Sequence, residues 1–300
     1  MELRKRILDS KEQRRALILA HYYQSMDVQG IADFVGDSFE MARRAAQTDA
    51  PVLVVCGVRF MAESAKLLSP DKRVLLPAPD AGCPMADMVA PEDVLALRRA
   101  YPDAAVMCYV NSSAAVKAVS DICCTSSSAV RVARSLSEKK IIFVPDQNLG
   151  AYTASQVPEK EFILFDGYCP IHHAIRAEDV ARARAAHPDA VLLAHPECRP
   201  EVVALADFVG STSMLLQYVL ERDAPSYLIG TELGIVERMR AIAPEKVIYP
   251  LSTRMTCVNM KKTTCEDVLR ALETLTPAVE LPREDTEGAA RTLRRMVEVV

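Results

Sequence analysis

The sequence predicts an α/β protein made of three homologous units, each a three-layer α/β/α sandwich with a short parallel sheet. The first observation is repetition, since Cys83, Cys169 and Cys257 lie 86 and 88 residues apart and a fixed period indicates repeated units. The second is a Glu-Asp-Val tripeptide that begins nine residues after each cysteine. The third is a series of short apolar runs without alternation, which indicates parallel strands buried on both faces. We therefore expect a pseudo-three-fold arrangement around a central active site.

Each copy contains three apolar runs that we expect to be strands. They are residues 17–20, 52–55 and 74–76, then 105–108, 141–144 and 162–165, then 191–194, 227–229 and 247–249. Helix-forming composition covers residues 39–46, 59–68 and 129–136. We place the units at 1–88 (with an N-terminal helix), 89–175 and 176–300. The last includes an amphipathic helical tail after Asp267, which we expect to pack on the third copy.

Polar residues recur in phase with the units. Four sets have steps of 88 and then 86 residues: His21, Tyr109, His195; Tyr23, Asn111, Glu197; Asp33, Asp121, Asp207; and Ser38, Ser126, Thr212. The first set follows strand runs directly, and the carboxyl ends of such strands form ligand crevices. Ser38 and Thr212 stand where a helix would begin, as caps or anion-binding groups do. The aspartates and the Glu-Asp-Val tripeptides are better explained as structural groups.

Composition limits the classes of function. The 300 residues carry a net charge of −4 and include no Trp, so neither a broad basic field nor a stacking platform for nucleic acid is expected. No apolar run reaches the roughly 18 residues of a membrane span. The first residues are charged and lack the apolar stretch of a signal peptide. We therefore expect a cytoplasmic protein that binds neither nucleic acid nor membranes.

Nine cysteines in a reducing compartment are not expected to form disulfides. Zinc sites use closely spaced cysteine pairs, and Cys83, Cys169 and Cys257 have no neighbour at that spacing. Three thiolates from distant loops can instead hold a four-iron cluster, which leaves one iron open as a Lewis acid. Buried cysteines without a metal are the alternative. The other six we expect to be packing residues: Cys56, Cys108, Cys123, Cys124, Cys198 and Cys265.

Ten short motifs occur in unbroken order between about Ala20 and Asp267. They read LAHYYQ (19–24), DFVGDS (33–38), DAGCPMA (80–86), YVNS (109–112), CTS (124–126), PDQNLG (145–150), GYCPIH (167–172), HPEC (195–198), GSTS (210–213) and CVNMK (257–261). Together they resemble the quinolinate synthase family. One departure is Cys265, where the family often has leucine. The family's histidine three residues after the second cysteine corresponds to His172 and not to His173.

The resemblance implies an enzyme that condenses iminoaspartate with dihydroxyacetone phosphate to give quinolinate, with loss of phosphate and two waters. It implies a [4Fe-4S] cluster held by Cys83, Cys169 and Cys257. It also implies a source of iminoaspartate such as L-aspartate oxidase or aspartate dehydrogenase. With these substrates, side-chain chemistry suggests four catalytic residues, Tyr23, Tyr109, His195 and Glu197. The residues suggested to bind substrate are His21, Ser38, Asn111, Ser126, His172, Ser211 and Thr212.

Two other interpretations stay open from the sequence. Another [4Fe-4S]-dependent hydro-lyase would share the open iron and differ in the shape of its pocket. A non-catalytic iron–sulfur metabolite sensor would need an output element, such as a DNA-binding helix pair with a basic face. The tail after Asp267 has mixed charge, so it does not favour that role. Turnover of dihydroxyacetone phosphate separates an enzyme from a sensor.

Overall fold

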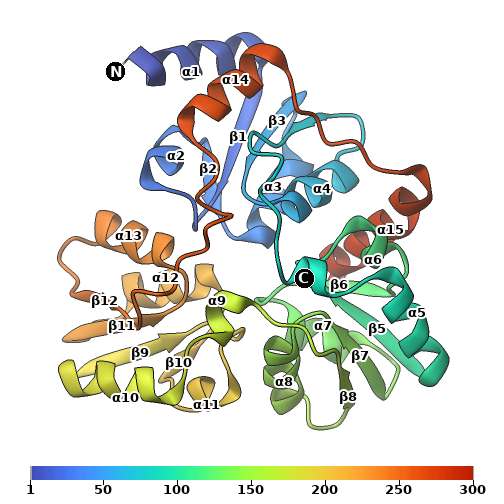
Figure 1. Ribbon diagram of the computed structural model, residues 1–300, viewed down its shortest axis with the longest axis vertical. Helices are drawn as coiled ribbons and strands as arrows, with labels where there is room; N and C mark the ends of the chain where they lie inside the picture. Colours follow the sequence, from blue (N-terminus) through green and yellow to red (C-terminus); the bar gives the residue numbers. More distant parts are fainter. Residues whose placement is uncertain (1, 300) are drawn as a thin grey trace.

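A computed structural model describes residues 2–299 and contains three separate four-stranded parallel sheets arranged around a centre (Figure 1). The three sheets share one strand order, β2-β1-β3-β4, β6-β5-β7-β8 and β10-β9-β11-β12. Every pairing between neighbouring strands in these sheets is parallel. Helices lie on both sides of each sheet. The predicted class, three α/β/α units, is therefore confirmed.

The elements follow the same order in each copy. The first sheet and its helices comprise α1 (Glu2–Arg14), β1 (Ala16–His21), α2 (Met26–Ile31), β2 (Phe34–Gly36), α3 (Ser38–Gln47), β3 (Val52–Cys56), α4 (Arg59–Leu68) and β4 (Arg73–Leu75), followed by a 3-10 turn, Ala86–Met88. The second comprises α5 (Pro91–Ala100), β5 (Ala104–Tyr109), α6 (Ala114–Ala118), β6 (Ile122–Cys124), α7 (Ala129–Ser135), β7 (Lys140–Val144), α8 (Gln147–Gln156), β8 (Glu161–Leu164) and α9 (Pro170–His173). The third comprises α10 (Ala177–Ala186), β9 (Ala190–Ala194), α11 (Pro200–Val203), β10 (Phe208–Val209), α12 (Thr212–Glu221), β11 (Ser226–Gly230), α13 (Leu233–Ile242), β12 (Ile248–Pro250), α14 (Cys265–Thr274) and α15 (Arg283–Val299).

All nine predicted strands are present, and three edge strands of two or three residues, β2, β6 and β10, were not predicted. The recurring aspartates explain where these edge strands begin. Each directly precedes an edge strand, and its carboxylate accepts a backbone N–H of the central strand beside it. The N–H groups belong to Ile18 for Asp33, Val106 for Asp121 and Leu192 for Asp207, at 2.7–2.9 Å. The expected structural role of the aspartates is confirmed.

The Glu-Asp-Val tripeptides lie in the first turns of α5, α10 and α14. Their aspartates reach back to accept the N–H of the residue that precedes the helix. These contacts join Asp93 to Ala90, Asp179 to Arg176 and Asp267 to Thr264, at 2.9–3.0 Å. Each therefore satisfies a backbone donor that the helix leaves unpaired, and the structural interpretation is confirmed.

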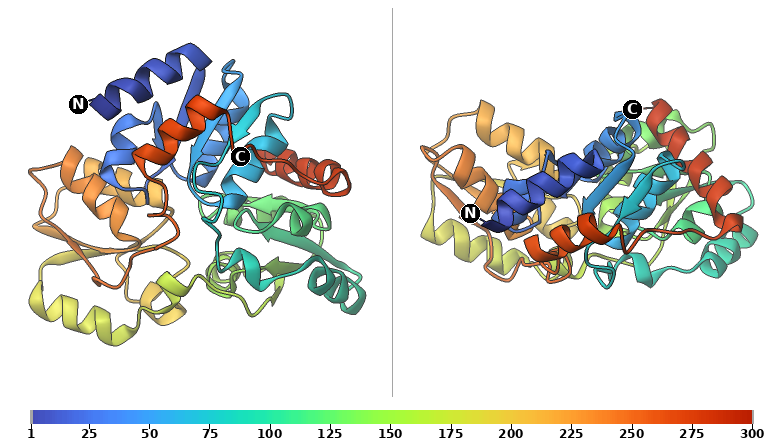
Figure 2. Two further views of the ribbon diagram at one scale, coloured as in Figure 1. Left: turned by 45° about the horizontal axis from the view of Figure 1, so that its top comes forward. Right: turned by 90° about the horizontal axis from the view of Figure 1, so that it is seen from above.

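The prediction that the C-terminal tail packs on the third copy was wrong. Helix α14 lies beside α1 and packs on β3 of the first sheet, and α15 packs on α6 and β6 of the second (Figure 2). Val268 and Leu272 share a core with Ile7 and Ile18. After the first cysteine loop α5 covers the second unit, and after the second cysteine loop α10 covers the third unit. Helix α14 follows the third cysteine and covers the first unit in the same way, which closes the ring. An apolar face predicts burial of a helix but not which unit buries it.

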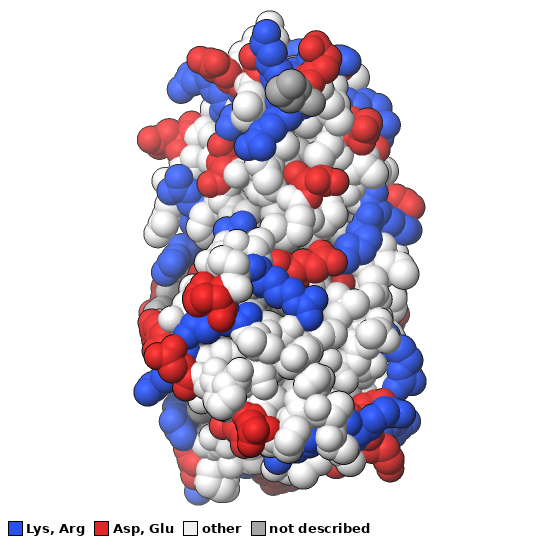
Figure 3. Space-filling model, turned by 90° about the vertical axis from the view of Figure 1, so that its left-hand side faces the viewer, with Lys and Arg blue, Asp and Glu red and all other residues white. Residues whose placement is uncertain are grey.

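The distribution of charged side chains on one face of the molecule (Figure 3) fits the small net charge of the sequence. On the face in Figure 3, basic and acidic side chains are interspersed over the elements. Across residues 2–299, none of the helices has the length and apolarity that a membrane crossing requires.

Candidate active site

The central strands bring the recurring polar residues to one place. His21 and Tyr109 end β1 and β5, and His195 follows β9 directly. One cavity at these strand ends is lined by nine of the predicted site residues: His21, Tyr23, Ser38, Tyr109, Asn111, Ser126, His195, Glu197 and Thr212. Parallel sheets bind ligands at their carboxyl ends, and here three sheets contribute to the same cavity.

Two of the units orient a histidine by the same local contact. The N–H of Tyr23 donates to Nδ1 of His21 (3.1 Å), and the N–H of Glu197 donates to Nδ1 of His195 (3.3 Å). Each contact uses the Nδ1 lone pair, so the proton of the neutral ring is on Nε2. Burial lowers the pKa of His21 to about 3, helped by His195, and lowers the pKa of His195 to about 4 despite Glu197. Both rings are therefore neutral donors at pH 7.

The buried histidines predict that stability falls on mild acidification. Their ordinary pKa is 6.5, whereas both rings stay neutral in the fold down to about pH 4. Between these values the unfolded chain binds more protons, so the free energy of unfolding decreases as pH is lowered. We expect a loss of about 1–2 kcal/mol per histidine between pH 6.5 and about pH 5. Urea unfolding of the chain and of His21→Gln measures this, and an unchanged pH dependence in the variant would contradict the assignment.

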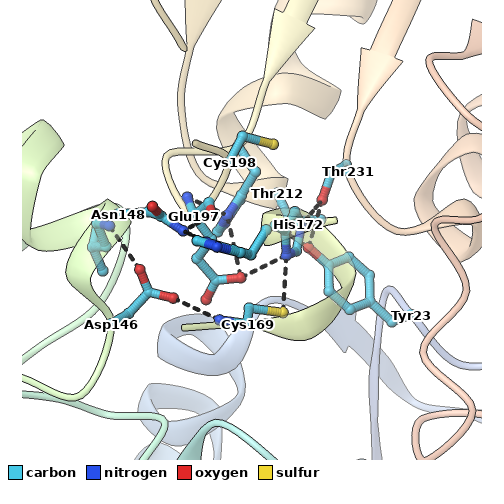
Figure 4. A network of polar contacts seen from close by, with 12 residues as sticks. Tyr23, Asp146, Asn148, Cys169, His172, Glu197, Cys198, Thr212 and Thr231 are labelled. Carbon is cyan, nitrogen blue, oxygen red and sulfur yellow. Dashed lines mark hydrogen bonds and ion pairs between the residues drawn. The ribbon is translucent and has the colours of Figure 1, made fainter. Parts of the chain in front are cut away.

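A continuous polar chain links Tyr23 to Glu197 (Figure 4). The Tyr23 hydroxyl lies 2.9 Å from Oγ1 of Thr212 and 2.8 Å from Oγ1 of Thr231. Thr231 lies 2.9 Å from Nε2 of His172, whose Nδ1 lies 2.8 Å from Oε2 of Glu197. Every link is within hydrogen-bonding distance, so a proton can be exchanged along the chain between the phenol and the carboxylate.

Glu197 carries a negative charge where the two cavities meet. Burial favours its neutral form, but His195 and His172, with a hydrogen bond from Tyr109, outweigh burial and bring the pKa of Glu197 to about 2. Burial, together with the nearby Glu197, raises the pKa of Tyr23 and of Tyr109 well above the ordinary value of 10.0. At neutral pH the Glu197 carboxylate therefore lies among protonated phenols and neutral imidazoles.

A second, adjoining cavity contains all three recurring cysteines. Cys83, Cys169 and Cys257 line it, and it shares Tyr23 and Glu197 with the first cavity. Asn111 and Met260 also line both cavities, and His172 lines the second. The cysteines come from the loops that follow β4, β8 and β12, one from each copy.

Sulfur is the donor that dominates this second cavity. Burial raises the pKa of each of the three thiols, that of Cys83 to about 12, so a cation must lie beside them if they are to be thiolates. Three soft ligands around one space suit an iron–sulfur cluster. A single metal ion would have a different set of three donors, since the ligand atoms of Cys169, His172 and Glu197 lie within 4.8 Å of one another. All nine cysteines are free thiols.

The helix-start hydroxyls have different surroundings from those expected. Ser38 and Thr212 are the first residues of α3 and α12, but the capping groups are Asp37 and Ser211. The expectation that Ser38 and Thr212 act as caps was therefore wrong by one residue. Ser211 lines neither cavity; its hydroxyl accepts the Met214 N–H and lies 3.4 Å from Asp37. Ser38 is thus free to face a ligand, whereas Ser211 is engaged in the structure.

Several polar residues near the cavities were not predicted from the sequence, among them Asp37, Asp146, Thr231 and Glu232. A signal existed for two of them, because Asp146 and Glu232 are 86 residues apart, which is the step between the second- and third-copy members of the four polar sets. Their difference in residue type concealed the match.

The model of one protein family, the quinolinate synthetase A protein, matches residues 5–298 of the chain. Among similar proteins, the quinolinate synthase of Caldicellulosiruptor saccharolyticus is 50% identical over 298 residues, which cover 99% of this chain and 98% of that protein. The quinolinate synthase of Alkaliphilus metalliredigens is 51% identical over 96% of this chain and 95% of its own length. That of Methanoregula boonei is 50% identical over 98% and 97%. The chain therefore belongs to the quinolinate synthetase A protein family.

Proposed function

We propose that the chain is a quinolinate synthase that condenses iminoaspartate with dihydroxyacetone phosphate, releasing phosphate and two waters. The observation that carries the proposal is the junction of two cavities, one lined by three cysteines and the other by the recurring polar residues. Membership of the family and about 50% identity to curated quinolinate synthases support it. We infer a cytoplasmic enzyme, supplied with iminoaspartate by an oxidation of aspartate such as that of L-aspartate oxidase or aspartate dehydrogenase.

Cys83, Cys169 and Cys257 are proposed to hold a [4Fe-4S] cluster. The donor set supports this assignment, because it offers three sulfurs from three loops and the pKa of each thiol is raised by burial. When bound, a cluster with three protein ligands supplies an open iron that acts as a Lewis acid on a substrate oxygen or nitrogen. Tyr23, Asn111 and Glu197 line both cavities, so they would stand between the iron and the rest of the substrate.

The first cavity has donors suited to phosphate and carboxylate groups. Ser38 lies at the N-terminus of the ten-residue α3, where hydroxyl and backbone donors favour anions. Ser126 lines the same cavity. His21 and His195 present neutral Nε2–H donors, as the contacts at Nδ1 imply. Asn111 adds an acceptor, because its buried Oδ1 has no hydrogen-bond partner within residues 2–299, and we propose that this oxygen accepts an N–H of iminoaspartate.

Proton transfer is proposed for Glu197, Tyr23, Tyr109 and His195. Glu197 is ionised and can remove a proton from a substrate carbon or hydroxyl at Oε2, the oxygen nearest His172. Tyr23 keeps its proton at Oη and is linked to Glu197 through Thr231 and His172. When Glu197 removes a proton from the substrate, Tyr23 can therefore donate a proton to the departing hydroxyl, and the chain of contacts between the two residues restores the proton on the phenol. The two losses of water each require one proton to be removed and one to be supplied.

The hydroxyl groups give a test of substrate assignment. Ser38, Ser126 and Thr212 are equivalent by repeat, but the substrates have no three-fold symmetry. Removing a hydroxyl that binds a charged ligand costs roughly 1.5–3 kcal/mol, so Ser38→Ala and Ser126→Ala should each weaken binding of one substrate and not both. Titration of the variants with each substrate separately measures this. Ser213→Ala is the matched control, because the Ser213 hydroxyl contacts two carboxylates and lines neither cavity. Normal binding of both substrates by all variants would contradict the assignment.

A further inference from the structure

One backbone contact recurs beside all three cysteines. The first residue of α4, α8 or α13 donates its N–H to the carbonyl of the residue two before the cysteine. The pairs are Arg59 with Ala81 (2.9 Å), Gln147 with Gly167 (2.8 Å) and Leu233 with Met255 (2.8 Å). Each cysteine loop is therefore tied to the start of the helix that follows the third strand of its unit.

In the second and third copies a buried carboxylate adds a further contact to the cysteine itself. Asp146, the N-cap of α8, accepts the N–H of Leu149 at one oxygen (2.8 Å) and the N–H of Cys169 at the other (3.0 Å; Figure 4). Glu232, the N-cap of α13, likewise accepts from Gly234 (2.6 Å) and from Cys257 (3.1 Å). In each case one oxygen caps a helix and the other holds a cysteine.

The repeat relates these two carboxylates and excludes a third. Asp146 and Glu232 are 86 residues apart, and the position 88 residues before Asp146 is Val58, the N-cap of α4. Valine has no acceptor, so the loop of Cys83 keeps the shared backbone contact without a carboxylate. Asp146 and Glu232 are both fully buried. Lys261 lies 3.2 Å from Oε1 of Glu232, the oxygen that also accepts from Cys257.

We propose that Asp146 and Glu232 are positioning residues that fix the backbone of Cys169 and Cys257 so that both sulfurs face the shared cavity. Capping a helix requires one acceptor oxygen, and the second oxygen of each carboxylate is instead directed at the cysteine. Groups that hydrogen-bond to a metal ligand without touching the metal strongly affect metal affinity. The inference rests on the proposed function, because it assumes that the three cysteines hold an iron–sulfur cluster.

The test compares helix capping with cysteine positioning. Asp146→Ser and Glu232→Ser keep one oxygen for the cap and lose the oxygen that reaches the cysteine. Asp207→Ser is the control, because Asp207 also accepts a backbone N–H, that of Leu192 in β9 (2.8 Å), but it precedes the edge strand β10 and contacts no cysteine. The chain and its variants are reconstituted with iron and sulfide without oxygen, and iron release to a chelator is followed over time. Melting of each cluster-free chain reports on folding.

We expect Asp146→Ser and Glu232→Ser to release iron on the order of 10–100-fold faster than the parent chain, while Asp207→Ser releases it at the parent rate. Cluster-free Asp146→Ser and Glu232→Ser should still fold, because serine is a good N-cap, but each should melt somewhat below the parent, because a buried cysteine N–H loses its acceptor. Release at the parent rate by both variants, or equally fast release by Asp207→Ser, would overturn the positioning role. A parent chain that binds no iron would instead overturn the proposed function and this inference together.

Discussion

Replacing any one of Cys83, Cys169 and Cys257 by alanine is expected to abolish the cluster and with it quinolinate formation. The parent chain, purified without oxygen, should be brown and contain about four irons and four sulfides, as one [4Fe-4S] cluster requires. Each variant loses one of the three sulfurs that line the second cavity. Iron and sulfide analysis, with the visible absorption spectrum, measures the loss in each variant.

The other cysteines are the controls for this prediction. Cys56, Cys108, Cys123, Cys124 and Cys198 are buried in the cores, and Cys265 is half-buried in α14. Their alanine variants should retain the cluster, because none of their sulfurs lines the cysteine cavity. A colourless zinc protein would contradict the assignment. So would loss of the cluster in Cys265→Ala but not in Cys257→Ala.

Glu197→Gln should keep the cluster and lower the rate of quinolinate formation by at least about a hundredfold, the usual contribution of a proton-transfer group. The amide preserves the shape of the side chain, but it removes the carboxylate whose pKa is held at about 2 beside His195 and His172. The rate is measured with the iron content of the same sample. Glu201→Gln, the same change at an exposed position of α11, should be active.

Tyr23→Phe should have an effect of similar size, because it removes the hydroxyl that joins Thr212 and Thr231. If Glu197→Gln or Tyr23→Phe turns over near the parent rate with intact iron, that residue has only a structural role.

The repeat made most of the fold predictable. Because Cys83, Cys169 and Cys257 keep nearly equal spacing, a strand in one copy indicated strands in the others. Edge strands such as β10 could not be predicted, since two residues are too few to form an apolar run. The packing of α15 on the second unit was also hidden, because it depends on contacts far apart in sequence, such as that between Thr292 and the carbonyl of Lys117.

The candidate site was predictable where residue types recur and hidden where they differ. His21 and His195 share one residue type and one phase, and both line the cavity. Asp146 and Glu232 share the phase but differ in type, and Val58 breaks the set. In the sequence Ser211-Thr212-Ser213, the repeat phase singles out Thr212 but does not show which hydroxyl caps the helix. The structure separates them, because Ser211 caps α12 and Thr212 lines the cavity.

The most direct test of the account is turnover of the two substrates by the chain carrying its cluster. We predict that, without oxygen, iminoaspartate and dihydroxyacetone phosphate yield quinolinate together with one phosphate for each quinolinate formed. The product is identified by chromatography and mass, and phosphate is counted in the same reaction. Binding of either substrate to the iron-loaded chain without formation of quinolinate would contradict the account and favour a non-catalytic sensor.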